Sequence, residues 1–204
     1  MTHPSAKIRR QFDRSASGLY DRSAGVQRFM AAQLAGMIRD ELVGTHAAPL
    51  ARIPAANLPV LEIGCGTGLL TERLAALLPP GGRLTAADLS PAMLEAAKSR
   101  LYARGGRNGQ GSGACPRDAD TPVAAAALAG LPPDAVRFLQ ADAEEWAAGA
   151  PSSSCGLIAS SACFQWFVRP AQTLVHLRRL LKPHGKLAAA TFGPDTFTET
   201  APFF

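Results

Sequence analysis

Short apolar runs alternate with helix-patterned segments from residue 60 onwards, and this alternation is the strongest structural signal in the chain. The apolar runs have the length of buried strands and cover residues 60–63, 83–88, 135–142, 156–161 and 186–192. Segments with apolar residues at helical spacing lie between several of these runs and cover residues 68–78, 90–103 and 170–181. Strands that alternate with helices predict an α/β fold in which a parallel, doubly wound sheet is covered on both faces.

The segment before the first strand is helical in pattern. A short helix is predicted around Lys7–Phe12, and a longer one over residues 20–43. The longer helix is indicated by apolar residues that recur at helical spacing, namely Val26, Phe29, Met30, Leu34, Met37 and Ile38. We therefore divide the chain into an N-terminal helical cap, residues 1–46, and an α/β core, residues 58–193.

Local patterns also predict a helix cap, the buried side of one helix and an insertion. Ser90 is a predicted cap with Pro91 at the first position of its helix. The helix at 170–181 is expected to turn Leu174, Leu177 and Leu181 inward. Residues 104–134 are rich in glycine and lack a period, which predicts a flexible insertion, with a functional lid as the alternative.

Composition narrows the class of protein. The chain has 204 residues, of which 47% are hydrophobic and 18% charged, as in one globular domain. A net charge of +5 weakly favours acidic partners. The four cysteines show no CxxC spacing and the histidines are scattered, so we expect reduced thiols and no metal site. With no apolar run of membrane-spanning length and no signal segment, we expect a cytoplasmic protein with no membrane partner.

A glycine loop follows the first predicted strand. It reads "LEIGCGTG" at residues 61–68 and connects the strand to a helix, an arrangement that holds cofactors in doubly wound folds. Its spacing is G-x-G-x-G, which differs from the G-x-G-x-x-G of dinucleotide-binding proteins. The second strand ends in Asp88 and the third in Asp142, so two carboxylates fall at matching strand ends. The alternative interpretation of both is helix capping.

Three motifs carry a family resemblance. "VLEIGCGTG", "AADLSPAML" and "FLQADAEE" resemble, in order and spacing, the cofactor motifs of class I S-adenosylmethionine-dependent methyltransferases. The resemblance implies that the backbone at Gly64, Cys65 and Gly66 passes the methionine part of S-adenosylmethionine. Glu62 would orient that loop or reach the amino group of the cofactor. Cys65 lacks a neighbouring base in the sequence, so we do not expect it to be a nucleophile.

The same resemblance assigns the remaining cofactor contacts. Asp88 would accept hydrogen bonds from the ribose hydroxyls, and Asp142 from the adenine amino group. The other implied contacts are the side chains of Leu89 and Met93 on the adenine face, the backbone of Ala143, and Ser161 at the end of the fourth strand. Plain core packing is the alternative for Leu89 and Met93.

Segments outside the cofactor motifs point to the methyl acceptor. The N-terminal "QFDRSASGLYDRSAGVQRFMAAQLAGMI", together with "SSACFQWF" and "LKPHGKLAAATFGPDTFTET", resembles malonyl-acyl-carrier-protein O-methyltransferases of biotin synthesis. The acceptor would then be the free carboxylate of malonyl-acyl carrier protein, an acidic partner. Trans-aconitate methyltransferases share the "QW" region and quinone methyltransferases share the core, so another small-molecule acceptor is the alternative. A carboxylate is ionised at pH 7, so its methylation needs no general base.

The resemblance also suggests residues that close the site. Tyr20 and Gln165 are the candidates near the reactive methyl group, with a packing role as the alternative for Tyr20. An arginine should meet the acceptor carboxylate, and the candidates are Arg14, Arg22, Arg28 and Arg169. Exposed arginines could steer an acidic carrier or form a solvated surface, and the candidates are Arg9, Arg10, Arg178 and Arg179.

One departure from the family pattern concerns the end of the chain. Family members continue beyond the fifth strand with lid helices and two further strands, whereas this chain stops after a short segment, residues 194–204. An inactive, truncated cofactor-binding module is therefore a second hypothesis. A nucleic-acid methyltransferase is disfavoured, because "SSACFQWF" stands where an "NPPY"-like motif would follow the fourth strand and the basic residues are dispersed.

Overall fold

The structure is a computed structural model of the chain. It describes residues 4–16, 21, 23–43, 59–102, 130–193 and 196. Tyr20 and Arg22 lie outside the described residues, as do residues 104–129 of the predicted insertion and all of the C-terminal segment 194–204 except residue 196.

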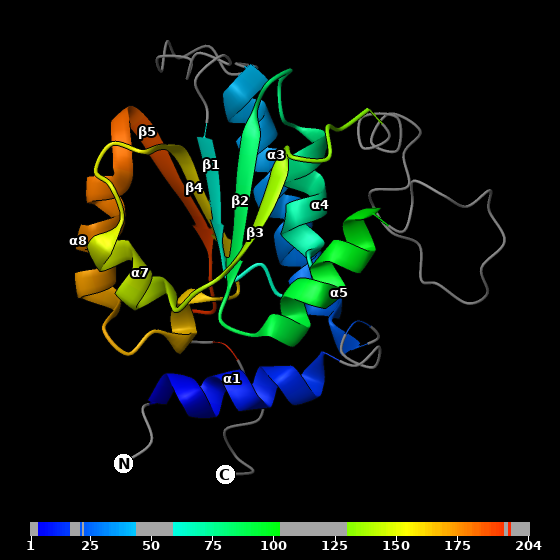
Figure 1. The fold of residues 1–204 in the computed structure, drawn as a ribbon, viewed down its shortest axis with the longest axis vertical. Coiled ribbons are helices and arrows are strands. Elements are labelled where there is room, and N and C mark those ends of the chain that lie inside the picture. The colour runs from blue at the N-terminus through cyan, green and yellow to red at the C-terminus, as the bar shows by residue number, and fades with distance from the viewer. Residues whose placement is uncertain are drawn as a thin grey trace, which may run out of the picture.

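A five-stranded sheet forms the centre of the molecule (Figure 1). Its strands are β1 (Pro59–Ile63), β2 (Arg83–Asp88), β3 (Val136–Gln140), β4 (Cys155–Ser161) and β5 (Leu181–Ala190). They are ordered β3-β2-β1-β4-β5, and every neighbouring pair is parallel. The order reverses between β1 and β4, which is the position where doubly wound sheets bind ligands. The predicted α/β fold with a parallel sheet is confirmed.

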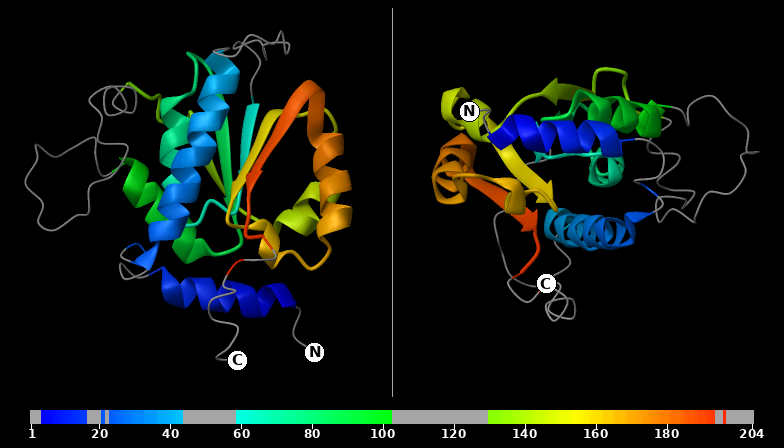
Figure 2. Two further views of the ribbon diagram at one scale, coloured as in Figure 1. Left: turned by 180° about the vertical axis from the view of Figure 1, so that it is seen from behind. Right: turned by 90° about the horizontal axis from the view of Figure 1, so that it is seen from below.

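Helices cover both faces of the sheet, as the two views in Figure 2 show. One face carries α3 (Gly25–Val43), α4 (Leu69–Ala76) and α5 (Pro91–Tyr102), and the other carries α7 (Ala143–Gly149) and α8 (Pro170–Leu180). Each face has its own apolar core, because the strands are buried on both sides. The remaining helix, α1 (Pro4–Ser15), lies across the end of the sheet at which the strands finish.

Two helices leave apolar side chains exposed, and at α8 this contradicts the prediction that Leu174 points inward. On α3, the side that carries Leu34 and Ile38 is buried, because the helix packs on α4 and β5 through it. The other side is exposed: Val26, Phe29 and Met37 are 56%, 64% and 70% exposed. On α8, Leu174 is 41% exposed.

The physical reason at α8 is a rotation of the buried stripe. The helix packs through Thr173, Leu177 and Leu180, which places Leu174 about 100° away from the buried side. Leu181 is partly buried, but it is the first residue of β5. The fifth strand therefore starts five residues before the predicted position, and α8 ends at Leu180.

Candidate functional site

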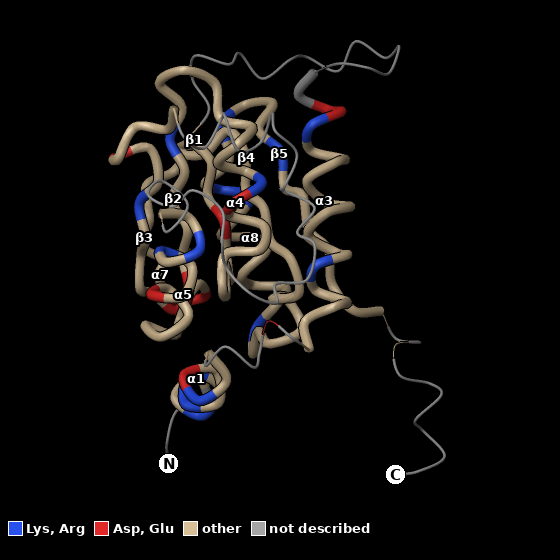
Figure 3. The backbone as a smooth tube through the Cα atoms, turned by 90° about the vertical axis from the view of Figure 1, so that its right-hand side faces the viewer, with Lys and Arg blue, Asp and Glu red and all other residues tan. Residues whose placement is uncertain are grey.

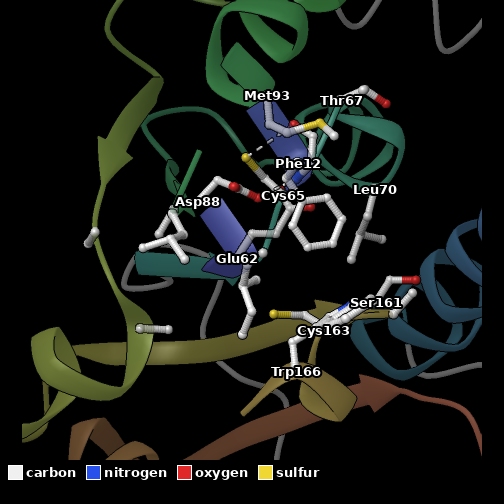
Figure 4. A pocket seen from close by; sticks show the side chains of 18 of the residues that line it. Phe12, Glu62, Cys65, Thr67, Leu70, Asp88, Met93, Ser161, Cys163 and Trp166 are labelled. Atoms are coloured by element: carbon white, nitrogen blue, oxygen red, sulfur yellow. Dashed lines mark hydrogen bonds between the residues drawn. The ribbon is translucent and has the colours of Figure 1, made fainter. Parts of the chain in front are cut away.

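A cavity of about 130 Å³ lies between α1 and the ends of β1, β2 and β4 (Figure 1). Figure 4 shows its lining residues from close by. Its walls come from the glycine loop, from the segments after β2, β3 and β4, and from α1 and α3. Four of the side chains that line it are carboxylates, namely Glu62, Asp88, Asp142 and Glu144. Among the described residues, no lysine, arginine or histidine lines the cavity, so its charge suits a cationic ligand.

The glycine loop brings bare backbone to the cavity wall. Gly64 and Gly66 have φ values of 68° and 53°, in the left-handed region that other residues rarely adopt. A Cβ atom at Gly64 would lie 2.4 Å from Cys163 Sγ, so glycine is required there by packing. Gly66 also lines the cavity, and a Cβ atom added there would meet no protein atom within 4 Å. The space beside Gly66 is therefore room for a ligand.

Asp88, at the end of β2, holds this loop in place. Its Oδ2 atom accepts a hydrogen bond from the Gly66 N–H at 2.8 Å, and its Oδ1 atom accepts one from the Ser90 N–H at 2.8 Å. Burial raises the pKa of Asp88, while these N–H donors act in the opposite direction. Each carboxylate oxygen can accept a further hydrogen bond, so the side chain can hold the loop and a hydroxyl-bearing ligand together.

Two buried polar atoms at the cavity lack partners. Glu62 is 1% exposed, and its Oε2 atom has no hydrogen-bond partner among the described residues. The same is true of Ser161 Oγ at the end of β4. Burial, with a smaller contribution from the nearby Asp88 carboxylate, raises the pKa of Glu62 to about 8. A buried carboxylate oxygen without a hydrogen-bond partner costs stability, so a ligand with an ammonium group fits beside Glu62 Oε2.

The segment after β3 supplies two further carboxylates. Asp142 caps α7, because its Oδ1 atom accepts a hydrogen bond from the Glu144 N–H at 3.0 Å. The capping role foreseen as an alternative is thus present, and the side chain also lines the cavity. Ala143 lies beside it in the wall.

Glu144 was not predicted, and it connects two sides of the site. Its Oε1 atom accepts hydrogen bonds from the Arg169 N–H at 2.7 Å and the Thr173 hydroxyl at 3.0 Å. Its Oε2 atom accepts one from the Val168 N–H at 2.9 Å. The carboxylate therefore fixes the start of α8 and the segment before it, which carries Trp166. The paired acids of "ADAEE" were the only sequence signal for this role.

Helix α1 forms the roof of the cavity. Ser5, Ile8 and Phe12 line the cavity from above, and the ring of Phe12 meets Trp166 edge-to-face with 5.3 Å between centroids. Asp13 ties the helix to the core, because its Oδ1 atom accepts a hydrogen bond from the Ser90 hydroxyl at 2.6 Å. Ser90 Oγ also accepts a hydrogen bond from the Met93 N–H at 3.1 Å, which confirms its predicted cap of α5.

A second connection joins the N-terminal helices to the glycine loop. Asp21 Oδ1 accepts a hydrogen bond from the Thr67 hydroxyl at 2.8 Å, and Asp21 Oδ2 pairs with the buried Arg100 of α5. Arg100 also donates from Nε to the Thr67 carbonyl at 2.7 Å. Asp21, which lies between α1 and α3, is therefore bonded directly to the glycine loop.

The structure brings all ten predicted cofactor residues to this cavity. They are Glu62, Gly64, Cys65, Gly66, Asp88, Leu89, Met93, Asp142, Ala143 and Ser161. Gln165 does not line it: its amide donates to the Ala162 carbonyl at 2.8 Å and accepts from the Thr191 hydroxyl at 3.0 Å. Arg14, Arg28 and Arg169 do not line it either.

Two thiols, Cys65 and Cys163, lie in the wall of the cavity. Burial raises the pKa of Cys163 to about 12 and raises the pKa of Cys65 well above its ordinary value. Both groups are therefore neutral thiols at pH 7, and the thiol is the unreactive form. The expectation that Cys65 has no catalytic role stays a prediction.

Comparison with known proteins now identifies the family. Residues 61–189 match the model of the methyltransferase domain family. The chain therefore belongs to this family, and its fold is that of class I S-adenosylmethionine-dependent methyltransferases.

Individual relatives of the chain are also named as methyltransferases. A malonyl-acyl-carrier-protein O-methyltransferase of Paenibacillus sp. (strain JDR-2) is 42% identical over 199 residues, which are 98% of this chain and 59% of that protein. A protein of the same name from Brevibacillus brevis is 39% identical over 69% of this chain and 40% of its own length. The chain thus spans about half the length of these curated relatives.

A solved structure gives the fold alone. Phosphoethanolamine N-methyltransferase 1 of Haemonchus contortus, determined with phosphoethanolamine and S-adenosylhomocysteine, superposes with a TM-score of 0.55 at 14% identity. The superposition covers 94% of this chain and 33% of that one. In the part of the present chain that the structure describes, no helix is long and apolar enough to cross a membrane.

Proposed function

We propose that this protein is an S-adenosylmethionine-dependent O-methyltransferase that methylates the free carboxylate of malonyl-acyl carrier protein. The observation that supports the cofactor is the acid-lined cavity beside Gly66, with the unpaired Glu62 Oε2 atom in its wall. The relatives named for this reaction support the acceptor.

The residues present fit this cofactor. When bound, S-adenosylmethionine supplies a methyl group activated by a sulfonium centre. Each oxygen of Asp88 accepts one hydrogen bond, from the Gly66 or the Ser90 N–H, and has a second lone pair. With these lone pairs Asp88 would accept hydrogen bonds from the ribose hydroxyls. Glu62 would hold the cofactor's ammonium group, which would lower the pKa of this carboxyl group because a neighbouring cation favours the ionised form.

The chain's own contribution to the reaction is alignment and exclusion of water. A malonyl carboxylate is already ionised at pH 7, so no residue has to remove a proton. The protein must instead hold acceptor and methyl group in line. The roof of α1 and the contact between Phe12 and Trp166 would keep water from the cavity. Tyr20 and Gln165 remain the proposed residues that close the site around the acceptor.

Transfer of labelled methyl groups tests the proposal. The chain is incubated with methyl-labelled S-adenosylmethionine and either malonyl- or acetyl-acyl carrier protein, and base-labile label on the carrier is counted. We expect label on the malonyl carrier only, because a methyl ester forms on the free carboxylate and is cleaved by base. Equal label on both carriers, or base-stable label, would exclude the carboxylate as acceptor. Binding of S-adenosylhomocysteine without any label would instead favour a non-catalytic cofactor-binding module.

A further inference from the structure

Helix α1 has two faces with different properties. Ser5, Ile8 and Phe12 face the cavity at helical spacing and form its roof. Lys7, Arg10 and Arg14 are exposed and recur at intervals of three and four residues along the opposite side of the helix. Figure 3 views this helix end-on, with its basic residues on the side turned away from the sheet.

The exposed side of α1 carries uncompensated positive charge. Among the described residues, no acid pairs with Lys7, Arg10 or Arg14, and the only hydrogen bond of the Arg10 side chain goes to the Ala6 carbonyl of its own helix. The one acid of α1, Asp13, is turned toward the core, where it accepts the hydrogen bond from Ser90. Three adjacent cations with no acid between them form a positive stripe on the surface.

We propose that this stripe, Lys7, Arg10 and Arg14, is the docking surface for an acidic protein, namely the carrier that delivers the methyl acceptor. The identity of the carrier rests on the proposed function. Charge complementarity supports the pairing, because a positive stripe raises the rate of encounter with an acidic partner and orients it. The stripe lies on the roof of the cavity, so a carrier docked there holds its acyl group near the site of methyl transfer.

Other charged partners suit the stripe less well. A helix that binds a membrane surface inserts an apolar face, but Ile8 and Phe12 are already turned into the cavity. Single-stranded nucleic acid is held by aromatic side chains together with cations, and the stripe carries no aromatic residue. An acidic protein needs only the charges that the stripe presents.

Reversal of the stripe's charge tests the proposal. The stripe variant Lys7→Glu/Arg10→Glu is compared with a matched control, Arg39→Glu/Arg137→Glu, which makes the same change in net charge at exposed positions on α3 and β3. Affinity for purified malonyl-acyl carrier protein is measured at about 50 mM and about 300 mM salt, because screening weakens surface charge pairs. We expect at least tenfold weaker binding for the stripe variant at low salt, a smaller difference at high salt, and less than a threefold change for the control.

A second measurement separates docking from damage to the cavity. The stripe does not line the cavity, so both variants should bind S-adenosylhomocysteine as the unchanged chain does. With malonyl-coenzyme A, a small thioester without a carrier, kcat/KM should be equal in both variants, while kcat/KM with the malonyl carrier falls at least tenfold in the stripe variant only. Equal losses in stripe and control variants would overturn the proposal. So would RNA binding that is tighter than carrier binding and is lost in the stripe variant.

The outcomes for the reaction and for the docking surface are distinguishable. If the unchanged chain methylates neither malonyl substrate, the proposed function fails. Carrier binding still reports on the stripe in that case, because it needs no turnover. If the chain methylates both substrates but the carrier binds the stripe variant and the control equally, the function holds and the docking surface is wrong.

Discussion

Substitution of Gly66 by alanine separates the stability of the fold from the binding of the cofactor. The residue has a φ of 53° and an added Cβ atom would meet no protein atom within 4 Å, yet the residue lines the cavity. The change therefore costs the fold only the conformational penalty of a left-handed alanine, about 1–2 kcal/mol. A ligand that passes close to the loop would, in contrast, collide with the new methyl group.

Gly81 offers a matched control. It has a φ of 77°, its Cβ position is also open, and it lies in the turn before β2 without lining the cavity. Both alanine variants should lose about 1–2 kcal/mol, which corresponds to a fall in Tm of about 2–8 °C for a chain of this size. Only Gly66→Ala should bind S-adenosylhomocysteine more weakly, by at least tenfold or about 1.4 kcal/mol.

Thermal unfolding followed by circular dichroism gives the two values of Tm, and isothermal titration gives the affinities. Titrations are carried out well below either Tm, so that both variants are folded. Equal affinities in the two variants would refute the reasoning, because they would mean that no ligand occupies the space beside Gly66. A much larger loss of stability for Gly66→Ala than for Gly81→Ala would show that the protein itself fills that space.

Two further predictions concern buried carboxylates. In the folded chain the pKa of Glu62 is about 8, whereas an unfolded glutamate has a pKa near 4.5. This group therefore makes the free energy of unfolding fall as pH rises between those two values. Glu62→Gln should remove that part of the pH dependence in urea unfolding, and an unchanged pH profile would contradict the assignment. Glu144→Gln should lower the free energy of unfolding by about 1–3 kcal/mol, because the amide cannot accept all three hydrogen bonds. The control Glu145→Gln, at an exposed position, should change it by less than about 0.5 kcal/mol. Equal effects would show that the hydrogen bonds of Glu144 contribute little to stability.

The sequence was sufficient to predict the sheet and the ligand-facing loop. Both depend on local patterns: an apolar run predicts a strand, and glycines between a strand and a helix predict a loop that approaches a ligand. Asp88 and Asp142 could be placed at the ligand-facing edge because they fall at strand ends in the sequence, whereas their roles toward a cofactor came from the family resemblance. Parallel strands end at one edge of a sheet, so residues far apart in the chain meet there.

Contacts between distant segments could not be predicted in this way. Glu144 bonds to residues 24 to 29 positions further on, and Asp13 and Ser90 are 77 positions apart. Neither pair belongs to a periodic pattern, because each depends on how a helix is placed after the chain has folded. The exposed side of α3 was missed for a related reason: helical spacing shows that a helix forms, but it does not show which part of a wide apolar stripe meets the core.

The most direct test of the account is a thermodynamic cycle between Asp88 and the ribose of the cofactor product. Affinities for S-adenosylhomocysteine and for its analogue without the ribose hydroxyls are measured by titration, with the unchanged chain and with Asp88→Asn. If Asp88 accepts hydrogen bonds from these hydroxyls, the unchanged chain prefers the natural ligand by about tenfold or more, and Asp88→Asn loses most of that preference. The same preference in both chains would contradict the central claim, because the carboxylate at the end of β2 would then not contact the ribose.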